Sequence, residues 1–272
     1  MLKRLNGFKR RYRWPIKWVV LGVTLLLVCY PYPHLFLRHL QRWGNPNALI
    51  DADAPCLAPL VTEFHGEIGD TGTPREVFKS VERYVAKRIR YAFDWDTWGV
   101  VDYLPTVDEV LARGCEDCDG RAVVAASLMR NLGYRAELVT DFTHVWVKTD
   151  HGEYMGPRPG KAVVVTDRGL QVNWGWELLS CFSEAIAYGV AVFPMGREGI
   201  VLLVAWLMLI GPRTGRRAAL AAGLLLLAGW LLLRPGGHTA WAPIRWMQFL
   251  AVALLLAGVV AGMWPTAPKD EC

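Results

Sequence analysis

The two ends of the sequence contain almost no acidic residues. Asp51 is the first Asp or Glu of the chain, and none occurs between Glu198 and Asp270. Residues 51–198 hold 23 of the 25 acidic residues and 15 Lys or Arg, a formal net charge of −8, whereas the whole chain carries +5. The positive balance therefore comes from basic residues beside apolar runs, and we expect no nucleic-acid partner.

Internal repeats and low-complexity tracts are also missing, which excludes a repeat protein and a long disordered chain. No small-residue cleavage site follows the first apolar run, so residues 1–30 are interpreted as an uncleaved membrane anchor. A cleaved signal peptide and a lipid anchor at Cys29 are the alternatives.

Four apolar runs dominate the ends of the chain, at residues 16–30, 199–211, 218–233 and 246–264. A helix needs roughly 20 apolar residues to cross the hydrocarbon core. The fourth run meets this length alone, and the third meets it if Arg217 and Arg234 reach out to the interface. The second run is short and needs the preceding stretch 185–194.

The Lys and Arg residues beside these runs predict the orientation, because cytoplasmic flanks are enriched in them. Residues 1–30 become a basic cytoplasmic tail and transmembrane anchor, and residues 31–198 an extracytoplasmic domain. Residues 199–264 become three transmembrane helices, and 265–272 a cytoplasmic tail. We therefore expect a protein of the inner or plasma membrane, with the lipid bilayer as a partner.

The domain 31–198 shows helix signals first and strand signals afterwards. Capping boxes at Thr73–Glu76 and Thr106–Glu109 begin two helices, and Gly114 ends the second. A third, apolar helix is predicted at about 118–132, and residues 91–103 between the first two are interpreted as a loop. Strands are expected at 136–139, 145–148 and 162–166. This order predicts an α+β fold with an antiparallel sheet.

Cys118 and His144 are the candidate reactive pair. Cys118 opens the buried helix, where free backbone N–H groups and the helix dipole favour a thiolate. Glu116, Asp117 and Asp119 surround the sulfur and oppose that effect. His144 begins a strand, from which an imidazole is able to take the thiol proton and pass it to a leaving amine.

These residues resemble the core of the transglutaminase-like superfamily. The resemblance covers about residues 75–170 and rests on three segments: Cys-Asp-Gly-Arg-Ala at 118–122, Leu-Met-Arg-Asn-Leu-Gly-Tyr-Arg-Ala at 128–136, and His-Val-Trp-Val at 144–147. It implies a papain-like fold and a Cys-His-Asp triad in that chain order.

The third member of this triad departs from the family pattern. The family places an Asp at the end of the strand after the His strand, where this sequence has Gly156. Asp167, after the next strand, is the substitute that we select, with Asp150 and Asn173 as rivals. Asp167 is equally interpretable as a turn residue before Gly169.

Other interpretations of the cysteines remain open. Cys115 and Cys118 form a C-x-x-C, which suits a redox pair or a disulfide in an oxidising compartment. A zinc site would use Cys115, Cys118 and His144. Cys56 and Cys181 flank the domain and either form a bridge or stay unpaired.

The sequence as a whole predicts a membrane-bound, transglutaminase-like thiol enzyme that hydrolyses or transfers amide bonds. We expect a protein or peptide substrate and neither cofactor nor metal, with Cys118, His144 and Asp167 as the catalytic residues. A catalytically inactive interaction module of the same fold and a C-x-x-C redox protein are the alternatives.

Overall fold

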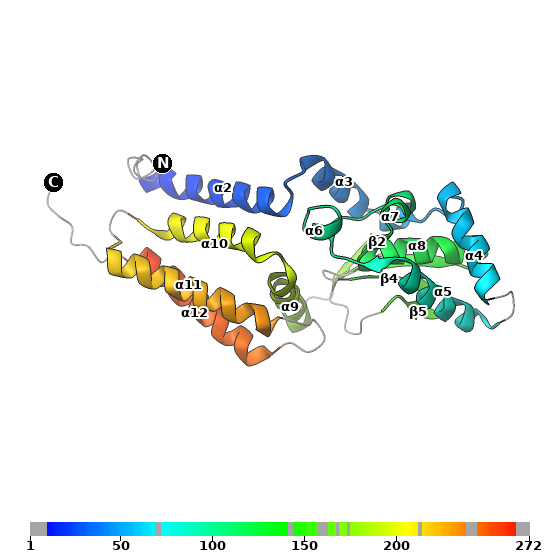
Figure 1. Cartoon of the computed structure of the whole chain (residues 1–272). Helices are drawn as coiled ribbons and strands as arrows, with labels where there is room; N and C mark the ends of the chain where they lie inside the picture. Colours follow the sequence, from blue (N-terminus) through cyan, green and yellow to red (C-terminus); the bar gives the residue numbers. More distant parts are fainter. Residues whose placement is uncertain are drawn as a thin grey trace. The chain divides into compact units, whose positions relative to one another are not determined.

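The computed structural model describes residues 10–68, 72–140, 144–156, 163–166, 169–172, 175–211, 214–237 and 244–264. The chain divides into two compact units (Figure 1). One comprises Met1–Pro31 together with Ser183–Cys272, and the other comprises Tyr32–Phe182. The second unit ends at Phe182, and the assignment of residues 31–198 to the extracytoplasmic side stays a prediction.

The first unit is built from apolar helices. It contains α2 (Arg10–Cys29), most of α9 (Trp176–Val192), α10 (Met195–Leu209), α11 (Arg216–Gly236) and α12 (Arg245–Met263). α11 and α12 are each long and apolar enough to cross a membrane, and up to four spans result if each of two bent helix pairs counts as one. The pair α9 and α10 is bent by 115°, so the stretch 185–194 does not lengthen the second apolar run in a straight line.

Small residues bring α11 and α12 together. A Cβ atom on Gly229 would lie 2.8 Å from the carbonyl oxygen of Ala251, and one on Gly258 would lie 2.9 Å from Leu226 Cγ. Close contact at glycines is typical of packed membrane helices. Arg234 of α11 forms an ion pair with Glu198 and donates to the carbonyl of Val190. It therefore bonds within the unit, where the sequence suggested an extended, interface-seeking side chain.

The second unit begins with helices and ends with a sheet. Its helices are α3 (Pro33–Trp43), α4 (Ala58–Ile68), α5 (Pro74–Arg88), α6 (Asp94–Thr97), α7 (Val107–Arg113) and α8 (Cys118–Asn131), with short 3-10 turns at Pro46–Leu49 and Pro55–Leu57. Its main strands are β3 (Ala136–Thr140), β4 (Val145–Thr149), β5 (Gly152–Tyr154), β6 (Val163–Thr166) and β7 (Gly169–Val172). They form an antiparallel sheet in the order β5-β4-β3-β6-β7.

Local signals predicted most of the helix ends. Both capping boxes are present, and Gly114 ends α7 in the left-handed conformation with φ 66°. The segment 91–103 was wrongly interpreted as plain loop. It contains α6, and β1 (Arg90–Tyr91) pairs in parallel with β2 (Cys115–Glu116) just before α8.

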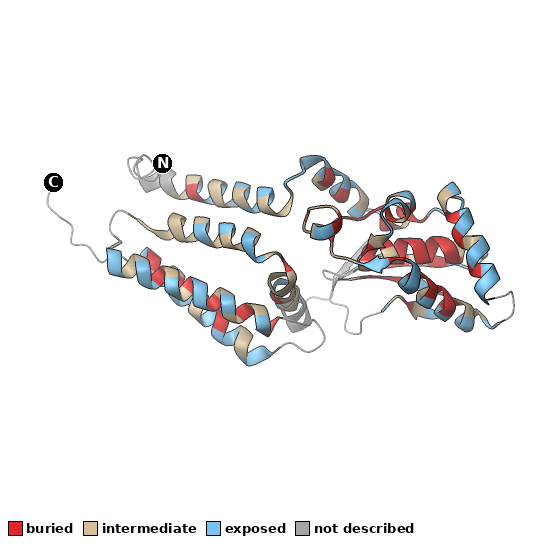
Figure 2. Ribbon diagram, viewed as in Figure 1, coloured by how far each residue is buried: buried red, intermediate tan, exposed pale blue. Residues whose placement is uncertain are grey.

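α8 forms the centre of the core, as its apolar composition predicted. All residues from Ala122 to Met129 are buried, and α8 contacts α5, α7, β3 and β4 (Figure 2). A helix surrounded in this way has little freedom to shift, so its first residue, Cys118, is held in place.

Candidate active site

Cys118 lies where α8 meets the beginning of β4. Asp117 caps the helix by accepting a hydrogen bond from the Asp119 N–H at 3.1 Å. The backbone N–H of Val145, the first residue of β4, lies near enough to the Cys118 sulfur to lower the pKa of the thiol, against the larger raising effect of burial. Since His144 directly precedes Val145, the fold brings the two sequence segments of the candidate pair together.

Acidic neighbours keep the Cys118 thiol protonated. The S–H group donates to Asp119 Oδ1 at 3.1 Å. Burial raises the pKa of Cys118 well above its ordinary value, and the carboxylates of Asp119 and Asp117 raise it further. Burial, with the acidic surroundings adding to it, therefore outweighs the effect of the helix N-terminus that favours a thiolate.

The imidazole of His144 is fixed by a main-chain carbonyl. His144 Nε2 lies 3.0 Å from the carbonyl oxygen of Met155, and its ring lies nearly parallel to that of Trp146, with 6.0 Å between centroids. A carbonyl only accepts hydrogen bonds, so Nε2 carries the proton of this contact. In the neutral ring, Nδ1 is then the basic nitrogen.

Gly156 occupies the place where the resemblance implies an aspartate. A Cβ atom built on Gly156 would lie 3.2 Å from His144 Nε2, so this position does face the imidazole. It offers no side chain, and the carbonyl of the preceding residue takes the contact with Nε2 instead. Asp167 and Asn173 lie outside the described residues, and Asp150 is exposed in the turn after β4.

A buried carboxyl group that the sequence did not reveal extends the acidic cluster. Asp94 of α6 is 1% exposed and Glu116 is 0% exposed, and carboxyl oxygens of the two residues lie within 4.8 Å of each other. Asp94 accepts from the Tyr103 N–H, and Trp98 Nε1 donates to both oxygens of Glu116 at 3.0 Å. Burial raises the pKa of both groups, and repulsion from Glu116 raises the pKa of Asp94 further, so two carboxyl groups this close in the interior are expected to share a proton. The Trp98 indole is thus hydrogen-bonded to a buried carboxyl group in the interior.

This cluster predicts that the unit loses stability as the pH rises. Burial raises the pKa of Glu116 from 4.5 to about 7, so the folded state binds its proton more tightly than the unfolded state does. The stabilisation is complete below pH 4.5 and is lost as the pH passes through about 7. Glu116→Gln should keep the Trp98 bond and raise the free energy of unfolding at pH 8 by roughly 1 to 3 kcal/mol.

Denaturant melts of the full chain between pH 4.5 and 8.5 measure this effect. Glu67→Gln is the control, because Glu67 is an exposed partner of Lys87. In Glu67→Gln, the free energy of unfolding should change with pH as steeply as it does in the wild type. An equally steep slope for Glu116→Gln would contradict the shared-proton interpretation.

The geometry gives little support to the zinc and redox interpretations. Two groups of ligand atoms converge among the described residues: Asp117 with Cys118 and Asp119, and Asp94 with Glu116 and Asp117. Neither contains Cys115 or His144, and the Trp98 N–H occupies the Glu116 oxygens that a cation would need. Cys115, Cys118 and Cys56 are free thiols, and Cys181 lies outside the described side chains.

A scan of known families agrees with this geometry. Residues 62–162 match the family described as the transglutaminase-like superfamily, which covers α5 to β5 and includes Cys118 and His144. No curated protein matches the chain. The matched segment begins and ends somewhat earlier than the range of about 75–170 expected from the motifs. The chain therefore contains a domain of the transglutaminase-like superfamily, spanning residues 62–162.

Proposed function

We propose that this domain is a papain-like thiol enzyme that acts on amide bonds of proteins or peptides. The observation that carries the proposal is the position of Cys118 at the start of a buried helix, against the strand that follows His144. The family match supports the same assignment. A nucleophile at a helix N-terminus beside a histidine is the arrangement that thiol acyl transfer needs.

In this mechanism, His144 Nδ1 accepts the thiol proton while the sulfur attacks the amide carbonyl. The C–S bond forms, the C–N bond then breaks, and the histidine returns the proton to the leaving amine. Water hydrolyses the resulting thioester, whereas an amine nucleophile completes a transfer. The Val145 N–H, which acts to lower the pKa of the thiol, is a candidate to stabilise charge at the reacting centre.

The resting state differs from a preformed thiolate–imidazolium pair. The thiol is held protonated by its burial and by Asp119 and Asp117. His144 therefore acts as a general base during the attack, and turnover should rise with pH until the acidic cluster weakens the fold.

The setting proposed for this chemistry is a membrane surface. α11 and α12 supply helices able to span a bilayer. The basic N-terminus and the Lys and Arg residues that flank the later apolar runs favour a cytoplasmic location for both ends. In this layout the domain lies on the extracytoplasmic side of a bacterial-type membrane anchor, where it meets proteins or peptides outside the cytoplasm.

The test uses the purified full chain in lipid nanodiscs and a library of internally quenched peptides, with and without a primary amine. Hydrolysis or amine incorporation should appear and should stop after iodoacetamide modifies Cys118, as located by mass spectrometry. Absence of both reactions across the library between pH 6 and 9 would overturn the proposal.

A non-catalytic interaction module is the second candidate, and one observation favours it specifically. Gly156 replaces the carboxylate that would stabilise an imidazolium, and the thiol is protonated at rest. Such a module should bind the same partner before and after alkylation of Cys118. An enzyme should lose turnover on alkylation, so the same modified sample separates the two candidates.

A further inference from the structure

Glu82 of α5 holds the peptide segment that contacts the histidine. Glu82 Oε1 accepts a hydrogen bond from the Met155 N–H at 2.8 Å, although the two residues are far apart in the chain. The carbonyl of the same Met155 contacts His144 Nε2 at 3.0 Å. One residue of main chain therefore joins the Glu82 carboxylate to the imidazole.

The conformation of Met155 explains why this segment needs support. Its φ is 67°, and it is the one described residue other than glycine with a positive φ. A side chain in this left-handed region is strained, and the strain costs free energy relative to the ordinary conformations. The charge-assisted bond from Glu82 offsets that cost and keeps the carbonyl directed at Nε2.

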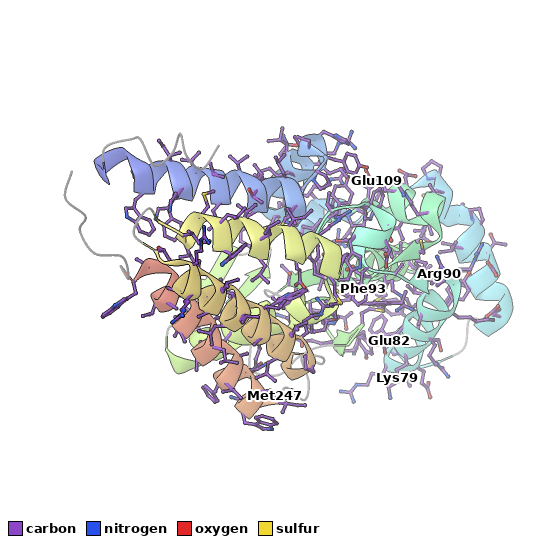
Figure 3. The ribbon with its side chains drawn as sticks, turned by 60° about the vertical axis from the view of Figure 1, so that its left-hand side comes forward. Lys79, Glu82, Arg90, Phe93, Glu109 and Met247 are labelled. Atoms are coloured by element: carbon purple, nitrogen blue, oxygen red, sulfur yellow. The ribbon has the colours of Figure 1, made fainter. Side chains whose placement is uncertain are left out.

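Glu82 is suited to this task by its own position. It projects from α5, as does Lys79, the residue one turn before it (Figure 3). α5 begins with a complete capping box at Thr73 and packs its buried face on α8. The carboxylate is half-buried and is therefore carried by a helix that the core holds in place.

From these contacts we propose that Glu82 is a positioning residue, acting through Met155, that replaces the missing aspartate of the triad. This inference rests on the proposed function for its catalytic meaning. The backbone carbonyl keeps the proton on Nε2 and leaves Nδ1 to accept a proton from Cys118. The contact that defines the role of Glu82 is with the Met155 N–H, so this role is one of positioning.

The experiment measures the tautomer of His144 directly. The full chain in nanodiscs is labelled with ¹⁵N-histidine, and because the chain has only six histidines, the ring signals of His144 are assigned by their loss in His144→Gln. The wild type should show the Nε2–H tautomer for His144. Glu82→Ala should produce a mixture of tautomers and slow the reaction of Cys118 with iodoacetamide about tenfold, whereas Glu82→Gln retains the acceptor and should stay within about twofold.

The Met155→Gly variant tests whether Glu82 acts on the histidine through Met155. Glycine adopts a positive φ without strain, so Met155→Gly should lessen the effect of Glu82→Ala. The control Glu67→Ala removes an exposed glutamate and should leave both signals unchanged.

Two results separate this inference from the proposed function. An unchanged tautomer and an unchanged alkylation rate in Glu82→Ala would overturn the positioning role, even if the protein hydrolyses peptides. A tautomer shift in that variant would support the role, even if no peptide is turned over.

Discussion

Replacing Cys118 with Ala should reduce amide hydrolysis or transfer by at least about 1000-fold, because no other group in the site is placed to form the thioester. The substitution is mild for the fold. It removes the hydrogen bond from the sulfur to Asp119 and leaves the helix cap at Asp117 in place. Turnover of a quenched peptide by the full chain in nanodiscs measures the loss.

Cys115→Ser is the matched control for this prediction. Cys115 is a free thiol in β2, three positions before the candidate nucleophile, and has no role in the proposed acyl transfer. Turnover should persist in Cys115→Ser. Loss of activity in both variants together with disulfide exchange in the wild type would instead support the C-x-x-C redox interpretation.

Gly120→Ala should be the most damaging single-methyl change in the domain. A Cβ atom there would lie 2.1 Å from Glu116 Cγ and 2.7 Å from Val110 Cγ2. Glu116 is fully buried and hydrogen-bonded to Trp98, so its side chain has no free space into which it could move away from the added methyl group. We expect the free energy of unfolding to fall by about 1 to 3 kcal/mol, with a melting temperature lower by roughly 3 to 10 °C.

Gly66→Ala provides the comparison. Gly66 lies inside α4, and a Cβ atom there would meet nothing within 4 Å. Alanine should therefore stabilise that helix by about 0.5 to 1 kcal/mol. Intrinsic fluorescence melts of both variants in nanodiscs measure the difference. Equal melting temperatures would show that α8 and β2 tolerate a side chain between them.

The Gly120 result also explains why the motif around the nucleophile is so compact. Only a residue without a side chain lets α8 start this close to β2. This contact brings Glu116 beside the first turn of α8, and the same close packing buries the Cys118 thiol. The packing that holds Cys118 in place therefore also raises its pKa.

The sequence by itself determined the features that depend on neighbouring residues. The capping boxes at Thr73 and Thr106, the end of α7 at Gly114 and the buried helix after Cys118 follow from patterns within a few residues. The absence of an aspartate at position 156 was also readable, because the motif spacing from His144 specifies that place.

The tertiary structure alone decided what surrounds the reactive pair. Asp94 reaches Glu116 from a segment without a strong local pattern, and Glu82 reaches Met155 across a separation of 73 residues. Spacing along a helix or strand says nothing of such contacts, because they arise from packing between elements. The same packing settled whether the helix N-terminus or the acidic neighbours dominate at Cys118, since burial strengthens nearby charges and disfavours a thiolate.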